Sequence, residues 1–139
     1  MDHQLDTRVT VLRLAFGATA ALAGLDKFFN ILVDWSTYIS PLAAQLLPFS
    51  PEAFMRVVGV IELGVGIAIL GAAPVIGAYI ASAWLILIAA NLVLSGHLDV
   101  AARDVVMSIS AFTLARLLEQ RQEAPEQAVS ERSRRTAVV

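Results

Sequence analysis

A long stretch without charge limits what this chain can fold into. Between Leu63 and Gly96 there is no Asp, Glu, Lys or Arg, and the stretch is interrupted only by the turn signal at residues 71–74, Gly-Ala-Ala-Pro. A soluble domain of this size would place charged residues on the solvated face of each helix. Two apolar helices that form a hairpin within lipid explain the pattern most simply.

The overall composition also indicates a small membrane protein. Of the 139 residues, 58% are hydrophobic, and the mean hydropathy is +0.72. The net charge of -2 gives no argument for nucleic-acid binding. Without cysteine, the chain has no disulfide, thiol chemistry or Cys-ligated metal site. The first apolar segment lacks a signal-peptide cleavage site, so we expect it to remain as a membrane span.

The apolar segments predict an all-α fold, a four-helix transmembrane bundle. Each segment has roughly 19–22 residues, enough to cross ~30 Å of hydrocarbon at ~1.5 Å per residue. The expected spans are Arg8–Phe29, Glu52–Leu70, Val75–Ser95 and Val100–Leu118.

The remaining segments are predicted to lie outside the spans. Residues 1–7 form a polar, frayed N-terminus before the membrane domain at 8–118. In the connector Asn30–Pro51, Trp35 and Tyr38 favour the headgroup level, which predicts a short interfacial helix ending at Pro48, between spans one and two. From Glu119 the chain is rich in Gln, Glu and Arg, which predicts a disordered cytoplasmic tail at 119–139.

The distribution of basic residues predicts the orientation. Four spans place both termini on one side, and seven of the ten basic residues lie on that side. The other three are Lys27, Arg56 and Arg103. The positive-inside rule therefore predicts a multi-pass protein of the plasma (inner) membrane, with both termini in the cytoplasm.

Polar residues within or near the spans gather toward the non-cytoplasmic side, which predicts a polar pocket between the helices that opens outward. The candidate pocket residues are Lys27, Arg56, Glu62, Asn91, His97, Asp99, Arg103 and Asp104. None can be assigned a catalytic role. A histidine metal site is not indicated, because the chain has only two histidines and they lie on opposite sides of the predicted membrane.

Glu62 is the most informative single residue, because an ionised carboxylate near mid-bilayer costs several kcal/mol, by order of magnitude, unless it is paired or hydrated. Helical spacing places it on one face with Gly59 and Gly66, where another helix can approach closely. Lys27 and Arg103 are better partners for it than Arg56. Two interpretations stay open: an ion pair that only fixes packing, or a group that binds a ligand, proton or substrate.

Position alone favours simpler interpretations for the other residues. Lys27, at the end of a span, would snorkel to the interface, and His97 would be a solvated turn residue. The aromatic side chains of Phe28, Phe29, Trp35 and Tyr38 would form an interfacial belt.

Three segments carry a resemblance to a known family. Residues 24–29, Gly-Leu-Asp-Lys-Phe-Phe, resemble the end of the first helix in the DoxX-like family, and residues 58–66 resemble its glycine-rich second helix with a glutamate. Residues 97–104 resemble the Asp-x-Ala-x-Arg-Asp opening of its fourth helix. The resemblance extends over about residues 8–118. It implies a four-helix integral membrane protein whose polar signature falls on Lys27, Glu62, Arg103 and Asp104.

The resemblance also implies a redox context, and three functions stay open. In the first, the chain is a redox-linked membrane subunit whose pocket binds a quinone or a small anion, with Lys27 and Arg103 as donors and Glu62 as proton acceptor. In the second, it is a non-catalytic accessory or assembly factor that packs against a membrane-protein partner or a second copy. A small-molecule or proton-coupled carrier is the third and weakest. Whether the protein is an enzyme stays open.

Overall fold

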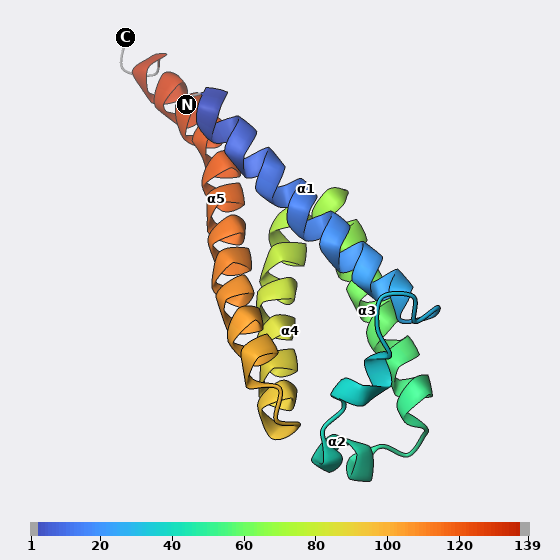
Figure 1. Cartoon of the computed structure of the whole chain (residues 1–139). Helices are drawn as coiled ribbons and strands as arrows, with labels where there is room; N and C mark the ends of the chain where they lie inside the picture. The colour runs from blue at the N-terminus through green and yellow to red at the C-terminus, as the bar shows by residue number, and fades with distance from the viewer. Residues whose placement is uncertain (1–2, 137–139) are drawn as a thin grey trace.

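The computed structural model describes residues 3–136, and within this range the secondary structure is helical (Figure 1). This confirms the predicted all-α class. Two short helices, η1 (Trp35–Tyr38) and α2 (Pro41–Leu46), lie in the connector between the first two long helices. The long helices are α1 (His3–Asp26), α3 (Pro51–Leu70), α4 (Pro74–Leu94) and α5 (Leu98–Thr136).

Local sequence explains where several helices begin and end. Ser50 caps α3 by accepting a hydrogen bond from the backbone N–H of Ala53, and Pro51 occupies the first turn, as the sequence predicts. The prediction that the first helix reaches Phe29 was wrong, because α1 ends at Asp26. There the Asp26 carboxylate accepts hydrogen bonds from backbone N–H groups in the following turn, which folds the chain back.

The long helices form two pairs. α1 packs against α3, and α4 packs against α5, so that the pairs meet near the α3–α4 turn and diverge toward the other end (Figure 1). Where they meet, Val65 and Ile69 of α3 pack against Ala81 of α4 and Ala111 of α5. This small apolar cluster joins the two pairs at one end and leaves them separate at the other.

Glycines bring α1 and α3 into backbone contact. A Cβ atom at Gly24 would lie 2.6 Å from the carbonyl oxygen of Gly59, and one at Gly66 would lie 2.5 Å from the backbone nitrogen of Ala21. Gly17 lies against Leu70 in the same interface. The close approach of another helix at Gly59 and Gly66, predicted from the sequence, is therefore made by α1, and close backbone packing replaces the hydrophobic driving force that lipid does not supply.

Three helices are long and apolar enough to cross a membrane: Asp6–Asp26, Pro51–Leu70 and Pro74–Leu94. The expected fourth span, Val100–Leu118, does not meet the same criterion, because charged residues enter it from both ends.

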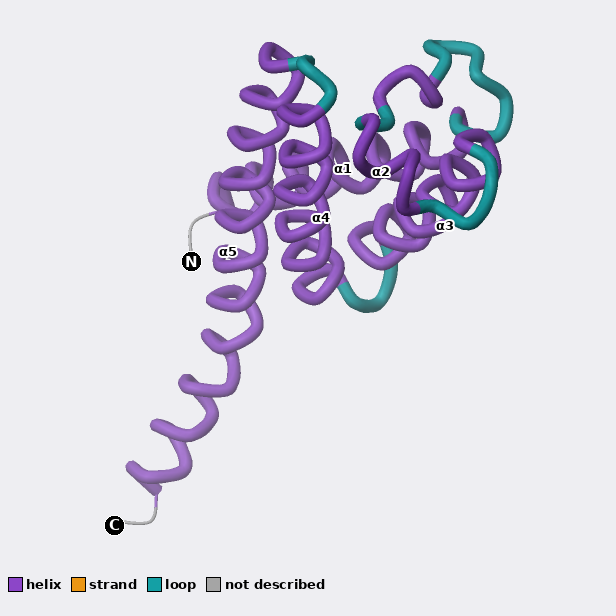
Figure 2. Tube along the Cα trace, turned by 90° about the horizontal axis from the view of Figure 1, so that it is seen from below, coloured by secondary structure: helices purple, strands orange, loops and turns teal. Residues whose placement is uncertain are grey.

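The C-terminal segment differs from its prediction. Residues 119–136 continue α5, which has 39 residues and at ~1.5 Å per residue is about 58 Å long, so that it projects beyond the other helices (Figure 2). Gln, Glu, Arg and Ala dominate this segment, and all four favour helix. Near its start Arg121 pairs with Asp6 of α1, at 3.2 Å between Nε and Oδ1. Helix α1 itself begins at His3, within the N-terminal segment that was expected to be frayed.

Near the turn between α3 and α4, Arg13 of α1 supplies hydrogen bonds to the C-terminal end of α3. Its guanidinium donates hydrogen bonds of 2.6 Å to the carbonyl oxygens of Ile69, Leu70 and Gly71. These are carbonyls that a helix leaves without an intrahelical partner. Arg13 thus connects α1 to the turn between α3 and α4.

Candidate functional site

A buried ion pair lies at the centre of the candidate site. Lys27, directly after α1, places Nζ 2.5 Å from Oε2 of Glu62 on α3, and both side chains are almost fully buried. Glu62 therefore faces the protein interior on the same side as Gly59, as predicted, and Lys27 is one of the two partners that the sequence favoured, the other being Arg103. The snorkelling interpretation of Lys27 was wrong, because its ammonium group points inward to the carboxylate.

A second carboxylate approaches the pair from the other helix pair. Asp104 on α5 is 5% exposed and interacts electrostatically with both Lys27 and Glu62. Its hydrogen-bond partner is Arg103, whose Nε and Nη2 atoms both lie 3.3 Å from Oδ1. The Arg103 side chain is 66% exposed. Lys27, Glu62 and Asp104 are thus buried, whereas the guanidinium of Arg103 lies at the solvated margin.

Trp84 of α4 places a hydrogen-bond donor beside the Glu62 carboxylate. Its indole Nε1 is buried and interacts with that carboxylate, but no well-formed hydrogen bond joins it to a residue that the structure describes. A buried indole N–H usually finds a partner, and leaving one unsatisfied costs about 1–3 kcal/mol. Sequence reasoning missed Trp84. Its position in the middle of a charge-free span was the available signal, because hydrocarbon offers an indole N–H no acceptor.

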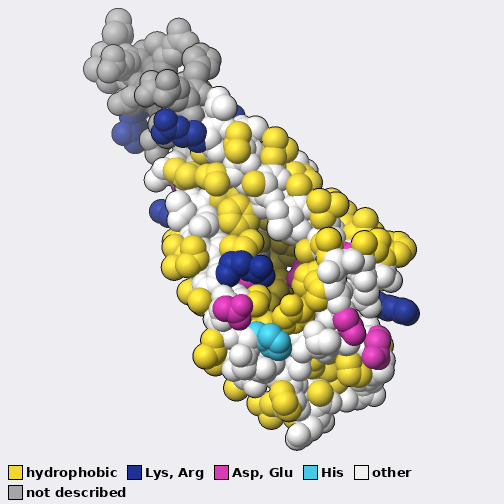
Figure 3. All heavy atoms as spheres, in the orientation of Figure 1, with side chains coloured by type: hydrophobic (Ala, Val, Ile, Leu, Met, Phe, Trp, Pro, Cys, Tyr) yellow, Lys and Arg dark blue, Asp and Glu magenta, His cyan; other side chains and the backbone are white. Residues whose placement is uncertain are grey.

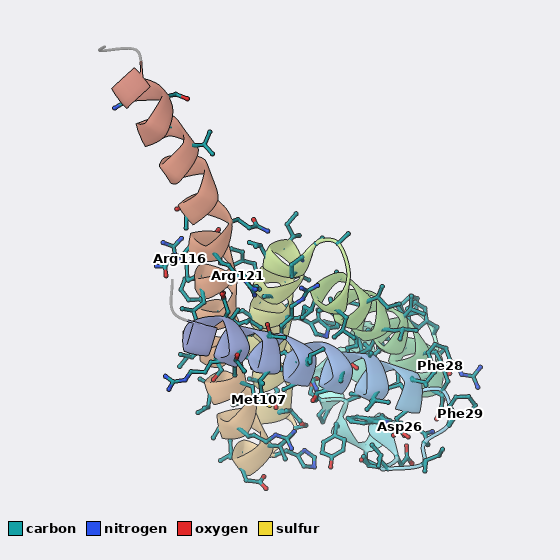
Figure 4. All side chains as sticks on the ribbon, turned by 90° about the horizontal axis from the view of Figure 1, so that it is seen from above. Asp26, Phe28, Phe29, Met107, Arg116 and Arg121 are labelled. Carbon is teal, nitrogen blue, oxygen red and sulfur yellow. The ribbon has the colours of Figure 1, made fainter. Side chains whose placement is uncertain are left out.

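Trp35 covers the lysine from the connector. The Lys27 ammonium lies 3.7 Å from the centroid of the Trp35 ring, and the Trp35 Nε1 donates a 2.8 Å hydrogen bond to Oδ2 of Asp26. Asp26 is itself buried at the start of the turn, where Figure 4 labels it. Asp26 therefore positions Trp35, and Trp35 encloses Lys27. The interpretation of Trp35 as part of an interfacial belt did not anticipate these contacts.

Two of the predicted pocket residues hold the connector in place. Asn91 accepts a hydrogen bond from the backbone N–H of Ser40 through Oδ1 and donates one from Nδ2 to the carbonyl oxygen of Tyr38, at 3.0 and 2.7 Å. The His97 ring lies 4.9 Å from the Tyr38 ring, centroid to centroid, and its Nδ1 is 3.2 Å from Ser95 Oγ. Both side chains therefore attach the connector to the α4–α5 end.

Two other predicted residues lie outside the cluster. Arg56 on α3 and Asp99 in the first turn of α5 are exposed, and the structure shows neither in contact with the buried ion pair. Within residues 3–136, excluding side chains too uncertain to describe, no group of three or more His, Asp or Glu residues is placed to hold a metal ion.

The surface of the protein carries a hollow between the two helix pairs (Figure 3). In Figure 3 the surface is hollowed between the two helix pairs, with hydrophobic side chains in the hollow and basic and acidic side chains at its margin. The cluster of Lys27, Glu62, Trp84 and Asp104 is named the inter-pair site below, because two of its side chains come from the α1–α3 pair and two from the α4–α5 pair. Such a site can offer both hydrogen-bond donors and acceptors to a ligand between the pairs.

The two hydrogen bonds between Asn91 and the connector, called the Asn91 tether below, can be tested by mutation. Asn91→Ala removes both hydrogen bonds to the connector, at a cost of about 1–3 kcal/mol for the backbone groups left unpaired. We expect faster chymotrypsin cleavage after Trp35 and Tyr38 in detergent-solubilised protein. Ser110→Ala, whose hydroxyl donates to the Val106 carbonyl oxygen within α5, should be cleaved at the wild-type rate. Equal cleavage of both variants would contradict the tether.

Comparison with known proteins agrees with the sequence resemblance. The model of the DoxX family matches residues 8–97, which include α1 from Arg8 onward, the connector, α3 and α4. Searches among curated proteins and among solved structures found no match. The matched region contains Lys27, Glu62 and Trp84, whereas Arg103 and Asp104 follow it. Because the match covers well over half of the sequence, the chain belongs to the DoxX family.

Proposed function

We propose that the protein crosses the membrane four times, with residues 100–118 of α5 as the fourth span and both termini in the cytoplasm. Helix α5 packs along α4, itself a candidate span, and Ser82 and Ser108 join them through reciprocal hydrogen bonds from each hydroxyl to the other's carbonyl oxygen. Val106 and Ile109 expose apolar side chains on the outer face. The excess of basic residues near the termini supports this orientation in the plasma membrane.

We further propose that the inter-pair site binds the polar head of a quinone and that the protein is a redox-linked membrane subunit. The observation that carries this proposal is the buried Lys27–Glu62 pair beside the buried indole N–H of Trp84, which makes no well-formed hydrogen bond to a described residue. Lys27 and Trp84 supply donors for a carbonyl oxygen, and Glu62 supplies a proton acceptor. The hydrophobic hollow between the pairs suits a ring and an isoprenoid tail (Figure 3).

The two tryptophans provide a direct assay. Trp35 and Trp84 are the chain's two tryptophans, and both lie at the inter-pair site, so a bound quinone should quench most of the intrinsic fluorescence. We expect saturable quenching when decylubiquinone is titrated into the detergent-purified protein, and a loss of affinity of tenfold or more in Glu62→Gln. Tenfold corresponds to ~1.4 kcal/mol, about the net value of one hydrogen bond to a charged group.

Glu52→Gln is the matched control, because Glu52 is an exposed carboxylate in the first turn of the same helix. It should titrate as the wild type does. Quenching that rises linearly without saturation, or an unchanged titration in Glu62→Gln, would rule out the quinone site.

The projecting part of α5 favours an accessory or assembly role as the second candidate. Residues 119–136 extend past the other helices and present a helix surface to a partner, either another membrane protein or a second copy (Figure 2). In this case a stoichiometric protein would co-purify from native membranes, and Glu62→Gln would not affect its recovery.

A further inference from the structure

The connector crosses from one helix pair to the other at the end where the pairs diverge, called the open end below (Figure 1, Figure 2). Its four-residue helix η1 contacts both pairs. The ring of its first residue, Trp35, lies over the ammonium group of Lys27, which follows α1. The carbonyl oxygen of its last residue, Tyr38, accepts a hydrogen bond from Asn91 of α4, and the Tyr38 ring lies against His97.

The two attachments of the connector differ in kind. The hydrogen bond from Trp35 to Asp26 is local, so that Trp35 moves with the end of α1. The Asn91 tether instead joins the connector to α4, through bonds of 3.0 and 2.7 Å to the backbone of Ser40 and Tyr38. Separation of the pairs at the open end would therefore break the Asn91 tether and leave Trp35 in place.

The opposite, closed end has the features of a hinge. Backbone contacts at the glycines hold α1 to α3, and the hydrogen bonds between Ser82 and Ser108 hold α4 to α5, so each pair can move as a unit. The α3–α4 connection consists of residues 71–73 alone. Hinge motions concentrate in a few such residues between helices. Movement of one pair relative to the other is thus expected at this turn.

We propose that the connector is a strap across the open end, and that release of the Asn91 tether lets the two helix pairs separate and exposes Lys27. Lys27 and Glu62 both move with the α1–α3 pair, so their ion pair is kept but gains water on the side that faces α4 and α5. Water weakens an ion pair and frees the amine to react. The strap controls access to Lys27 whichever ligand the inter-pair site binds.

Spin labels can measure the separation of the pairs, because the chain has no cysteine of its own. Arg56→Cys on α3 and Asp99→Cys on α5 place labels at exposed positions near the open end. Pulsed electron paramagnetic resonance then gives their distance in the detergent-purified full chain. Asn91→Leu keeps a similar side-chain size and removes both tether bonds. We expect it to raise the population of a longer distance about tenfold or more.

The same opening can be followed without labels, because Lys27 is the single lysine of the chain and its side chain is 5% exposed. Sulfosuccinimidyl acetate modifies accessible amines, and peptide mass spectrometry quantifies the acetylation of Lys27. When opening and closing are fast relative to the modification, the rate follows the open population. We therefore expect Asn91→Leu to be acetylated at Lys27 about tenfold faster or more than the wild type.

A second label pair, Ile67→Cys on α3 with Thr113→Cys on α5, reports on the closed end. Its distance should be the same with and without Asn91→Leu, which also shows that the variant is folded. Ser110→Ala, whose hydroxyl bonds within α5, should match the wild type in both measurements.

An unchanged distance at the open end would overturn the strap, and so would acetylation of Lys27 at the wild-type rate. A closed-end distance that changes with the open-end distance would overturn it as well, because the pairs would then not pivot about residues 71–73. None of these measurements uses a quinone, so failure of the quinone site and failure of the strap are distinguishable.

Discussion

Replacing Lys27 with methionine is expected to lower the free energy of unfolding by about 3–5 kcal/mol, the range observed when one partner of a buried ion pair is removed. The reason is the burial of Glu62, which would lose its 2.5 Å contact and remain enclosed without a cation. Trp35 would also lose the ammonium group beneath its ring. Denaturant titration in mixed micelles, followed by circular dichroism, measures the change.

A double-mutant cycle separates the structural role of the pair from its binding role. Lys27→Met combined with Glu62→Met replaces both charges by apolar side chains of similar length, and we expect stability to return to within about 1 kcal/mol of the wild type. Quinone binding should not return, because the charged groups are gone. Arg56→Met, an exposed cation of α3, should change stability by about 0.5 kcal/mol or less. A double variant as unstable as Lys27→Met would contradict the pairing.

The membrane-spanning helices could be predicted because their signals are local. Charge-free stretches, turn signals and the Ser50–Pro51 cap identify α3 and α4 to within a few residues. The end of α1 could not be predicted, because it depends on Asp26 binding backbone groups in the following turn. The C-terminal helix was missed for a different reason. Its polar composition indicates disorder, but the same residues favour helix once α5 has been nucleated by packing against α4.

The site could be predicted only in part. Glu62 stood out because a carboxylate within a span requires a partner, but the sequence left Lys27 and Arg103 as equal candidates for that partner. Trp84 and Trp35 belong to the site because of the way four helices and the connector pack together. The periodicity of the sequence does not indicate this packing. For the same reason Asn91 and Arg56 looked equivalent to the buried residues. The position of a residue along a helix indicates its depth in the membrane. Whether its side chain is buried depends on which faces of the helices pack against each other, and the sequence does not show that.

The α1–α3 interface leads to the second prediction with a large effect. Gly66→Ala should destabilise the protein by about 1–3 kcal/mol or more, the usual cost of adding a methyl group to a packed interior. The added Cβ would lie 2.5 Å from the backbone nitrogen of Ala21 and 2.7 Å from the carbonyl oxygen of Gly17. Both contacts are with backbone, so neither neighbour can rotate away. The helices would have to separate, and close packing is what holds them together in lipid.

Gly64→Ala is the matched control, because it makes the same change two residues earlier on α3, where an added Cβ would meet nothing within 4 Å. Alanine favours helix over glycine by up to ~1 kcal/mol, so this variant should be neutral or more stable. The two alanine variants should therefore differ in the sign of their effect on the unfolding free energy, measured by the same denaturant titration. If Gly66→Ala were as stable as Gly64→Ala, α1 and α3 would not approach as closely as the backbone contacts at Gly66 require.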